Sequence, residues 1–148
     1  MFELRWQIMK TVELGPWVYC LNDGDNQELK NKEKVGKWMH FHNNVDFADK
    51  ICHKAIEENI VVECKYTNAP TGVCCFYINY DDIEAHKRVI NFFIKNNLIR
   101  KTKTGKFFNI SFKLDSQTRN REYANSGFKS EIKLAEFINL ETGEWIYK

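Results

Sequence analysis

The chain lacks the motifs that identify most nucleotide-dependent enzymes and hydrolases. It has no G-x-x-x-x-G-K-[ST] loop, no G-x-G-x-x-G turn and no G-x-S-x-G nucleophile elbow. No apolar run approaches the ~20 residues of a membrane span, and the N-terminal residues lack the apolar core of a signal peptide. We therefore expect a cytoplasmic protein without membrane contact. Catalysis is not indicated, and phosphoryl transfer or hydrolysis is the least favoured function.

Glycine, proline and paired cysteines are also scarce. With 7 Gly and 2 Pro in 148 residues there is little room for flexible linkers. We expect one domain over 1–148, with a core at about 16–123 and a tail at 130–148 that packs on it. The 5 cysteines form no C-x-x-C pair and lie in apolar patterns, which predicts buried free thiols. The pair His40 and His42 has no third ligand at clear spacing, so we expect no metal and no cofactor.

Aromatic residues are abundant, and the periodicity of apolar residues predicts both strands and helices. Period-two alternation predicts strands at 17–21, 35–42, 61–67 and 73–79, the last being the most hydrophobic and so central. Residues 98–102 and 107–114 are predicted to form a hairpin. Helical spacing predicts a helix at 45–59, capped by Asn43 or Asn44, and a second helix that ends at 96–97. Asp81 and Glu84 suggest a capping box for the second helix.

This order of elements indicates an α+β fold with a curved, mostly antiparallel sheet. Two amphipathic helices are enough to cover one face of such a sheet, so the other face should be open and concave. We expect the open face to display the polar residues of alternating strands, which are Glu63, Lys65, Thr67, Asn109, Ser111 and Lys113.

The segment 106–123 is the most informative stretch, because its alternating strand runs into a polar segment with Thr118, Arg119, Arg121 and Tyr123. Lys65 and Lys113 on one sheet face would repel each other without an anion between them. With nearby hydroxyls, including that of Thr67, they could cradle a phosphate or carboxylate. Asp115 could orient a lysine, and the arginines could bind an anion through two N–H groups. The alternative is that Lys65 pairs with Glu63 or Asp115 on a solvated surface.

Four tryptophans, at positions 6, 17, 38 and 145, form the second group of interest. An aromatic ring on an open sheet can stack on a nucleobase, although most tryptophans of small domains are core residues. Trp38, beside Lys37, is the candidate for stacking.

Short motifs at 34–41 (KVGKWMHF), 63–68 (ECKYTN), 72–82 (GVCCFYINYDD) and 112–123 (FKLDSQTRNREY) resemble one family. It is the family typified by basophilic-leukaemia-expressed protein, a domain of unknown function with a fold like the cap-binding translation initiation factor 4E. The resemblance implies a curved antiparallel sheet backed by helices. It also implies that Trp38 stacks on a base while Lys65, Lys113 and the arginines contact phosphates. The chain has no second loop tryptophan beside an acidic residue, which argues against the cap itself as the ligand.

The leading hypothesis is a non-enzymatic binding domain for a nucleotide or other phosphorylated small ligand on the concave sheet face. One alternative is a protein-interaction module, such as a phage-encoded inhibitor of a host defence complex. The preference for Lys and Asn over Arg and Ala suits an AT-rich bacterial or phage genome. A third hypothesis is single-stranded RNA binding through Trp38 and the basic run at 100–106. The ligand-binding residues expected under the leading hypothesis are Lys37, Trp38, Lys65, Thr67, Lys113, Asp115, Thr118, Arg119, Arg121 and Tyr123.

Overall fold

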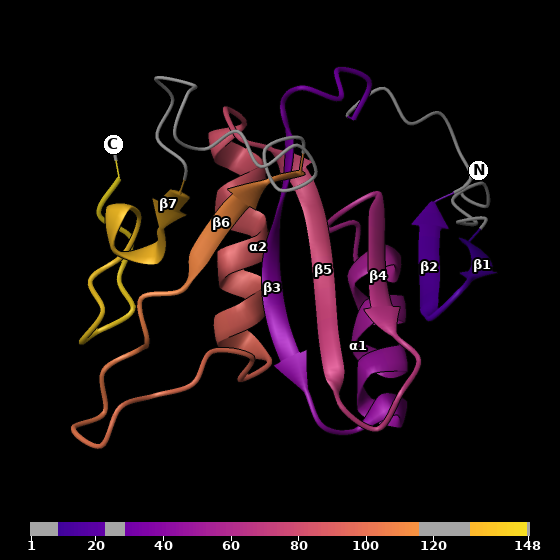
Figure 1. Ribbon diagram of the computed structural model, residues 1–148. Helices are drawn as coiled ribbons and strands as arrows, with labels where there is room; N and C mark the ends of the chain where they lie inside the picture. Colours follow the sequence, from indigo (N-terminus) through magenta and orange to yellow (C-terminus); the bar gives the residue numbers. More distant parts are fainter. Residues whose placement is uncertain (1–8, 23–28, 116–130, 148) are drawn as a thin grey trace, which may run out of the picture.

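In the computed structural model, which describes residues 9–22, 29–115 and 131–147, a curved sheet carries two helices on one face (Figure 1). The helices are α1 (Val45–Glu57) and α2 (Ile83–Lys95). The strands are β1 (Met9–Leu14), β2 (Trp17–Asn22), β3 (Val35–His42), β4 (Glu63–Thr67), β5 (Gly72–Asn79), β6 (Ser111–Leu114) and β7 (Glu131–Lys133). The expected α+β fold with a curved antiparallel sheet is confirmed. Neither helix is long and apolar enough to cross a membrane.

The seven strands lie in the order β1-β2-β4-β5-β3-β6-β7, and every neighbouring pair is antiparallel. β5 is the middle strand, as its hydrophobic sequence predicted. β3 pairs with β5 along its whole length, from Val35 opposite Asn79 to His42 opposite Gly72. Its pairing with β6 covers only Gly36 to Trp38. From Met39 to His42, β3 therefore pairs with β5 on one side and with no other described strand on the other side.

Both helices begin at a side-chain cap and bury one apolar face. Asn44 caps α1 by accepting a hydrogen bond from the Phe47 amide. Asp82, not Asp81, caps α2 and accepts from the Ala85 amide. Asp81 instead forms an ion pair with Lys34 at 2.7 Å, so the predicted capping box of Asp81 and Glu84 is wrong.

The core lies between the helices and the covered face of the sheet. Its largest fully buried side chains include Trp38, Phe76, Phe93 and Phe112. All five cysteines are buried and carry free thiols. The buried residues at 134–138 belong to the same core, beside a 3-10 turn at Leu134–Glu136. The open face has a second, smaller cluster made of Leu29, Val35, Cys75 and Tyr77, so the loop before β3 covers part of that face.

The segment from 98 to 114 differs most from the sequence-based prediction. Only Ser111–Leu114 forms a strand, and the predicted hairpin partner is reduced to an isolated bridge between Lys101 and Phe107. β6 pairs with β3 and β7 instead, because its apolar side chains Phe112 and Leu114 are buried in the core that β3 also covers. The edge strand β1 was not predicted. Between α2 and β6 the chain swings out to the lower left of the sheet (Figure 1).

Candidate functional site

Alternate residues of four strands bring polar and aromatic side chains together on the open face. Lys65 of β4 lies opposite Tyr19 of β2 on one side and Cys75 of β5 on the other. Lys37 of β3 lies opposite Tyr77 of β5 and Lys113 of β6. Because side chains alternate along a strand, this register places all of these residues on the same face.

A hollow of about 360 Å³ lies on this face and is called here the open-face hollow. Aromatic rings, lysines and carboxylates share its lining, which consists of Tyr19, Leu29, Lys32, Val35, Glu63, Lys65, Tyr77 and Asp115. It lies where the loop before β3 meets the sheet, so its wall is formed partly by the smaller apolar cluster around Leu29.

Lys65 contacts three aromatic rings, of which those of Tyr19 and Tyr77 also line this hollow. Its ammonium nitrogen lies 3.9 Å from the centroid of the Trp17 ring, 5.3 Å from that of Tyr19 and 5.8 Å from that of Tyr77. Ring faces attract a cation but accept no strong hydrogen bond from it. Within residues 9–22, 29–115 and 131–147, Lys65 forms no ion pair with a carboxylate, so the alternative pairing with Glu63 or Asp115 is wrong.

Asp115 binds a different lysine. The Lys37 ammonium donates to the Asp115 carboxylate at 2.8 Å, and the two side chains are 11% and 29% exposed. Lys113 lies directly across the β3–β6 pair from Lys37. The expectation that Asp115 orients a lysine holds for Lys37, but Lys37 thereby has less capacity to bind an external anion.

Burial shifts the acid–base properties of the residues that line the hollow. Desolvation raises the pKa of the Glu63 carboxyl, while the charges of Lys32 and Lys65 oppose that shift. Desolvation also raises the pKa of the Tyr77 hydroxyl, with the carboxylate of Asp115 acting in the same direction. Tyr77 is therefore a neutral hydroxyl at physiological pH.

Trp38 is in the wrong place for stacking on a ligand of the open face. It is fully buried on the helix-covered side, where its indole N–H donates to His86 Nδ1 at 3.1 Å. Its ring packs against Phe112 and Phe137. Trp38 follows Lys37 in the same strand, and neighbouring strand residues point to opposite faces. The prediction that both belong to one site was therefore wrong.

The remaining predicted site residues are dispersed. The Thr67 hydroxyl accepts a hydrogen bond from the Val73 amide and donates to the Val73 carbonyl, so it fixes the turn between β4 and β5. Lys113 lines a separate hollow beside β3. Asn109 lies outside the strands and its side-chain oxygen accepts from the Ala135 amide. Thr118, Arg119, Arg121 and Tyr123 lie outside the described residues.

The two histidines of β3 have structural hydrogen bonds. His42 accepts from the Asn44 amide at Nδ1 and donates from Nε2 to the Thr67 carbonyl, and His40 donates from Nδ1 to the Leu98 carbonyl. In the part of the chain that the structure describes, no group of three or more His, Cys, Asp or Glu side chains is arranged to hold a metal ion.

Sequence reasoning missed the aromatic contacts of Lys65. Trp17 and Tyr19 alternate along β2, and Tyr77 alternates with Phe76 and Ile78, which face the main core, so the period-two pattern already assigned them to one face of each strand. The order of the strands in the sheet was needed to bring the three rings around one lysine.

Comparison with known proteins shows a similarity in fold. No protein-family model and no curated protein sequence matches this chain. Among solved structures it is similar to eIF4E-3 of Ascaris suum in complex with m2,2,7G cap, at 12% identity and a TM-score of 0.51 over 80% of this chain and 69% of that chain. The same protein in complex with m7G cap gives 11% identity and a TM-score of 0.49, over 80% and 68% of the two chains. The match at a TM-score of 0.51 shows that the described residues have an eIF4E-like fold.

Proposed function

We propose that this chain is a non-enzymatic binding domain for a nucleotide or another phosphorylated small ligand, held in the open-face hollow. One observation carries the proposal: the Lys65 ammonium lies among three aromatic rings, with no carboxylate of the described residues at ion-pair distance. An ammonium has three N–H donors, and aromatic faces leave them without strong acceptors. Phosphate oxygens would supply those acceptors.

The mixed charge of the hollow supports a nucleotide over a simple anion. Lys32 and Lys65 favour anionic oxygens, whereas Glu63 and Asp115 favour N–H or O–H donors. A nucleotide presents both kinds of group, on its phosphates and on its base and sugar. The rings of Tyr19 and Tyr77 offer apolar area against which a base or sugar could pack.

The fold similarity supports the same proposal, because the Ascaris suum protein of similar fold was solved with a cap nucleotide. Together with the motifs at 34–41, 63–68, 72–82 and 112–123, it also supports our proposal that the chain is related to the basophilic-leukaemia-expressed protein family. Because Trp38 is buried on the covered face, it is not available to hold the base of a cap nucleotide in this hollow. We further propose a cytoplasmic protein of bacterial or phage origin.

The test is a thermal-shift series with nucleoside mono-, di- and triphosphates and cyclic nucleotides. A stabilising nucleotide at about 100 times its Kd should raise Tm by roughly 5–10 °C. Lys65→Ala should abolish this shift while lowering stability by only about 0.5–1 kcal/mol, the usual strength of an exposed cation–π contact. Lys50→Ala, on the exposed face of α1, is the matched control and should keep the shift.

Two results would contradict the proposal. One is an equal nucleotide-induced shift in the wild-type protein and in Lys65→Ala. The other is no stabilisation by any nucleotide, which would favour the protein-interaction module and direct the next experiment to capture of a protein partner.

A further inference from the structure

A second hollow lies beside the half of β3 that does not pair with β6, away from Lys65. It has a volume of about 390 Å³ and is called here the β3 slot. It lies between the end of β3 and the segment that joins α2 to β6, because β6 pairs with β3 only as far as Trp38. The residues that line the slot include His40, Phe41, Arg100, Phe108 and Lys113.

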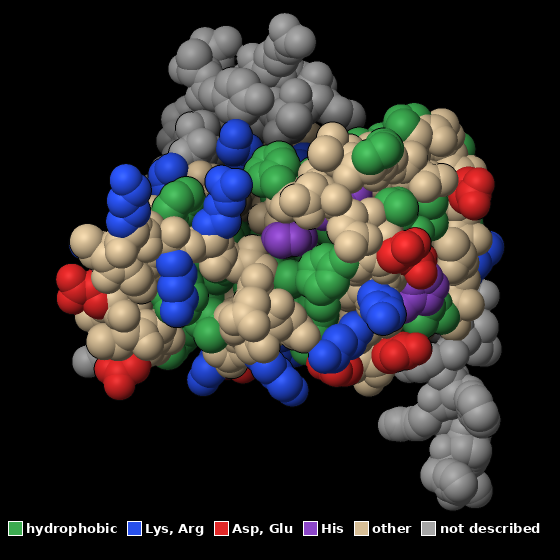
Figure 2. Space-filling view, turned by 90° about the horizontal axis from the view of Figure 1, so that it is seen from below, with side chains coloured by type: hydrophobic (Ala, Val, Ile, Leu, Met, Phe, Trp, Pro, Cys, Tyr) green, Lys and Arg blue, Asp and Glu red, His purple; other side chains and the backbone are tan. Residues whose placement is uncertain are grey.

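Exposed aromatic rings gather at this slot. Phe41 is 73% exposed and Phe108 is 39% exposed, and both line it. Phe47, which is 38% exposed, contacts the His40 ring at a centroid distance of 6.0 Å. Leaving such rings in water is unfavourable, and clustered exposure of this kind indicates a binding surface. Seen from below, hydrophobic side chains and one histidine lie in the middle of this end of the molecule (Figure 2).

The charge around the slot is positive. Arg100 and Lys113 line it, and Lys101, Lys103 and Lys106 follow Arg100 on the exposed segment. Figure 2 shows Lys and Arg side chains gathered toward the left of this end, the side of the α2–β6 segment. None of the described residues that line the slot carries a carboxylate. Some of these cations have weak contacts: Lys101 lies over the Phe107 ring at 4.8 Å, and Lys106 is 3.9 Å from Glu141.

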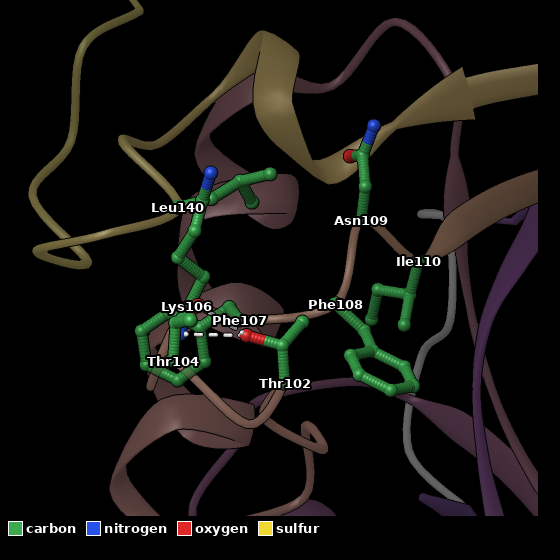
Figure 3. A pocket seen from close by; sticks show the side chains of 8 residues that line it. All are labelled: Thr102, Thr104, Lys106, Phe107, Phe108, Asn109, Ile110 and Leu140. Atoms are coloured by element: carbon green, nitrogen blue, oxygen red, sulfur yellow. Dashed lines mark hydrogen bonds between the residues drawn. The ribbon is translucent and has the colours of Figure 1, made fainter.

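A third hollow continues from the slot along the same basic segment. It has a volume of about 610 Å³ and is lined by Thr102, Thr104 and Lys106, among others, and it shares Phe108 and Ile110 with the β3 slot. In Figure 3 the Phe108 and Ile110 side chains point to the same side, away from Lys106 and Leu140. The Thr102 hydroxyl accepts a hydrogen bond from the Lys106 amide, which closes the turn of this segment.

His40 adds a hydrogen-bond acceptor to the slot. Its Nδ1–H donates to the Leu98 carbonyl at 3.0 Å, which leaves Nε2 as the acceptor of the neutral ring. Burial lowers the pKa of His40, so the ring is neutral at physiological pH. A neutral acceptor beside exposed rings suits the N–H groups of a nucleobase.

We propose that the β3 slot and the hollow beyond Phe108 form a binding site for single-stranded nucleic acid, with a base packed on Phe41 and Phe108 and phosphates at Arg100 and the lysines that follow it. Stacking on exposed rings combined with a positive track is the usual means of binding single strands without sequence preference. A protein partner fits less well, because lysine is depleted in protein interfaces while this surface has several. The proposal does not depend on the open-face hollow or on Lys65.

The experiment is fluorescence anisotropy of the full chain with labelled oligothymidylate and oligouridylate at low salt, and with a duplex of the same length. We expect binding to the single strands. Phe41→Ala and Phe108→Ala should each weaken it roughly 5- to 150-fold, the range found for removing one stacking ring. Each cation that contacts a phosphate should contribute about 0.7 to the slope of log K against log salt, and Arg100→Gln should remove one such contribution.

The controls separate binding from folding. Phe41→Trp keeps a stacking ring and should retain binding. Leu14→Ala removes a hydrophobic side chain that is 58% exposed on β1, at the other end of the strand order, and should not change it. Lys50→Ala, which removes a cation on the exposed face of α1, should also bind oligonucleotide normally.

Three outcomes would overturn the inference. The first is no binding of any single strand at low salt. The second is unchanged binding by Phe41→Ala and Phe108→Ala. The third is sedimentation evidence that the wild-type chain self-associates and that Phe41→Ala abolishes this, which would make the slot an interface between copies of the chain.

Discussion

The two faces of the sheet each hold a cluster of aromatic rings around a polar group, but the polar groups differ in their partners. On the helix-covered face, Trp38 donates to His86 Nδ1, and His86 Nε2 donates to the Tyr80 carbonyl at 2.8 Å. On the open face, three rings surround Lys65, and no carboxylate of the described residues lies within ion-pair distance of its ammonium.

This difference indicates which cluster is structural and which can bind a ligand. A buried group whose donors and acceptors are all satisfied contributes to stability, and an external ligand would have to break those bonds. A group whose donors still lack strong acceptors gains by binding a ligand that supplies them. Aromatic content alone does not distinguish the two clusters, since a tryptophan belongs to each.

The largest loss of stability is expected from a substitution in the cluster around Trp38 and His86 on the helix-covered face. Trp38→Ala leaves a cavity among Phe112, Phe137 and His86 and removes the donor to His86, so it should lower the free energy of unfolding by about 3–5 kcal/mol. Trp17→Ala, on the open face, should cost only about 1 kcal/mol. Urea denaturation of both variants measures this. Equal costs would mean that the open-face rings are as structural as the covered ones.

A smaller effect is expected from a substitution at Gly36, where β3 packs closely against β6. A Cβ added at Gly36 would lie 2.5 Å from Phe112 Cζ and 2.7 Å from the Lys113 carbonyl oxygen. Gly36→Ala should therefore destabilise the protein by about 1–3 kcal/mol and increase amide hydrogen exchange in β6. Ser111→Ala, in β6, is the control, and its free energy of unfolding should stay within about 0.5 kcal/mol of the wild-type value. Unchanged exchange in Gly36→Ala would contradict the close packing of this pair.

The smallest expected effect is a pH dependence of the covered cluster. Burial lowers the pKa of His86 from its ordinary value of 6.5, although its hydrogen bond to the Tyr80 carbonyl opposes the shift. Below that value the unfolded chain binds a proton at this site that the folded chain does not, so stability is full above about pH 6.5 and falls as the pH drops toward the lowered pKa. His40, whose pKa is also lowered, acts in the same direction.

His86→Gln tests this assignment, because glutamine can accept from Trp38 and donate to the Tyr80 carbonyl without titrating. The free energy of unfolding, measured from about pH 8 to about pH 5, should fall less steeply in this variant than in the wild-type protein. Its value at about pH 8 provides the baseline for any general loss of stability. Identical slopes would show that another group controls the acid sensitivity.

Much of the architecture could be predicted from local patterns. The alternation at 35–42 identified β3, and the apolar spacing after Asn44 and Asp82 identified both helices to within a few residues at their ends. The predicted hairpin at 98–114 was wrong because alternation of apolar residues indicates only that a segment is extended. It does not indicate which strand the segment pairs with. Phe108 shows this directly: it continues the alternation of β6 but is exposed outside the strand.

The candidate site was predictable only in part. Alternation alone required Lys37 and Trp38 to face opposite sides, so assigning both to one ligand conflicted with the pattern from the start. Lys65 was identified correctly as a residue of the open face, but Trp17 and Tyr77 come from strands that are distant in the sequence. The β3 slot could not be foreseen, since it depends on where the β3–β6 pairing ends.

The sequence by itself determined which residues are extended or helical and which side of each element is apolar, because these depend on backbone geometry and on neighbours within a few residues. The tertiary structure decided which polar groups meet. Asp115 lies 78 residues from the lysine that it binds and 50 positions from Lys65. Only the order and register of the strands placed it against Lys37 and left Lys65 among aromatic rings. Such contacts depend on distances across the sheet, which local sequence patterns do not encode.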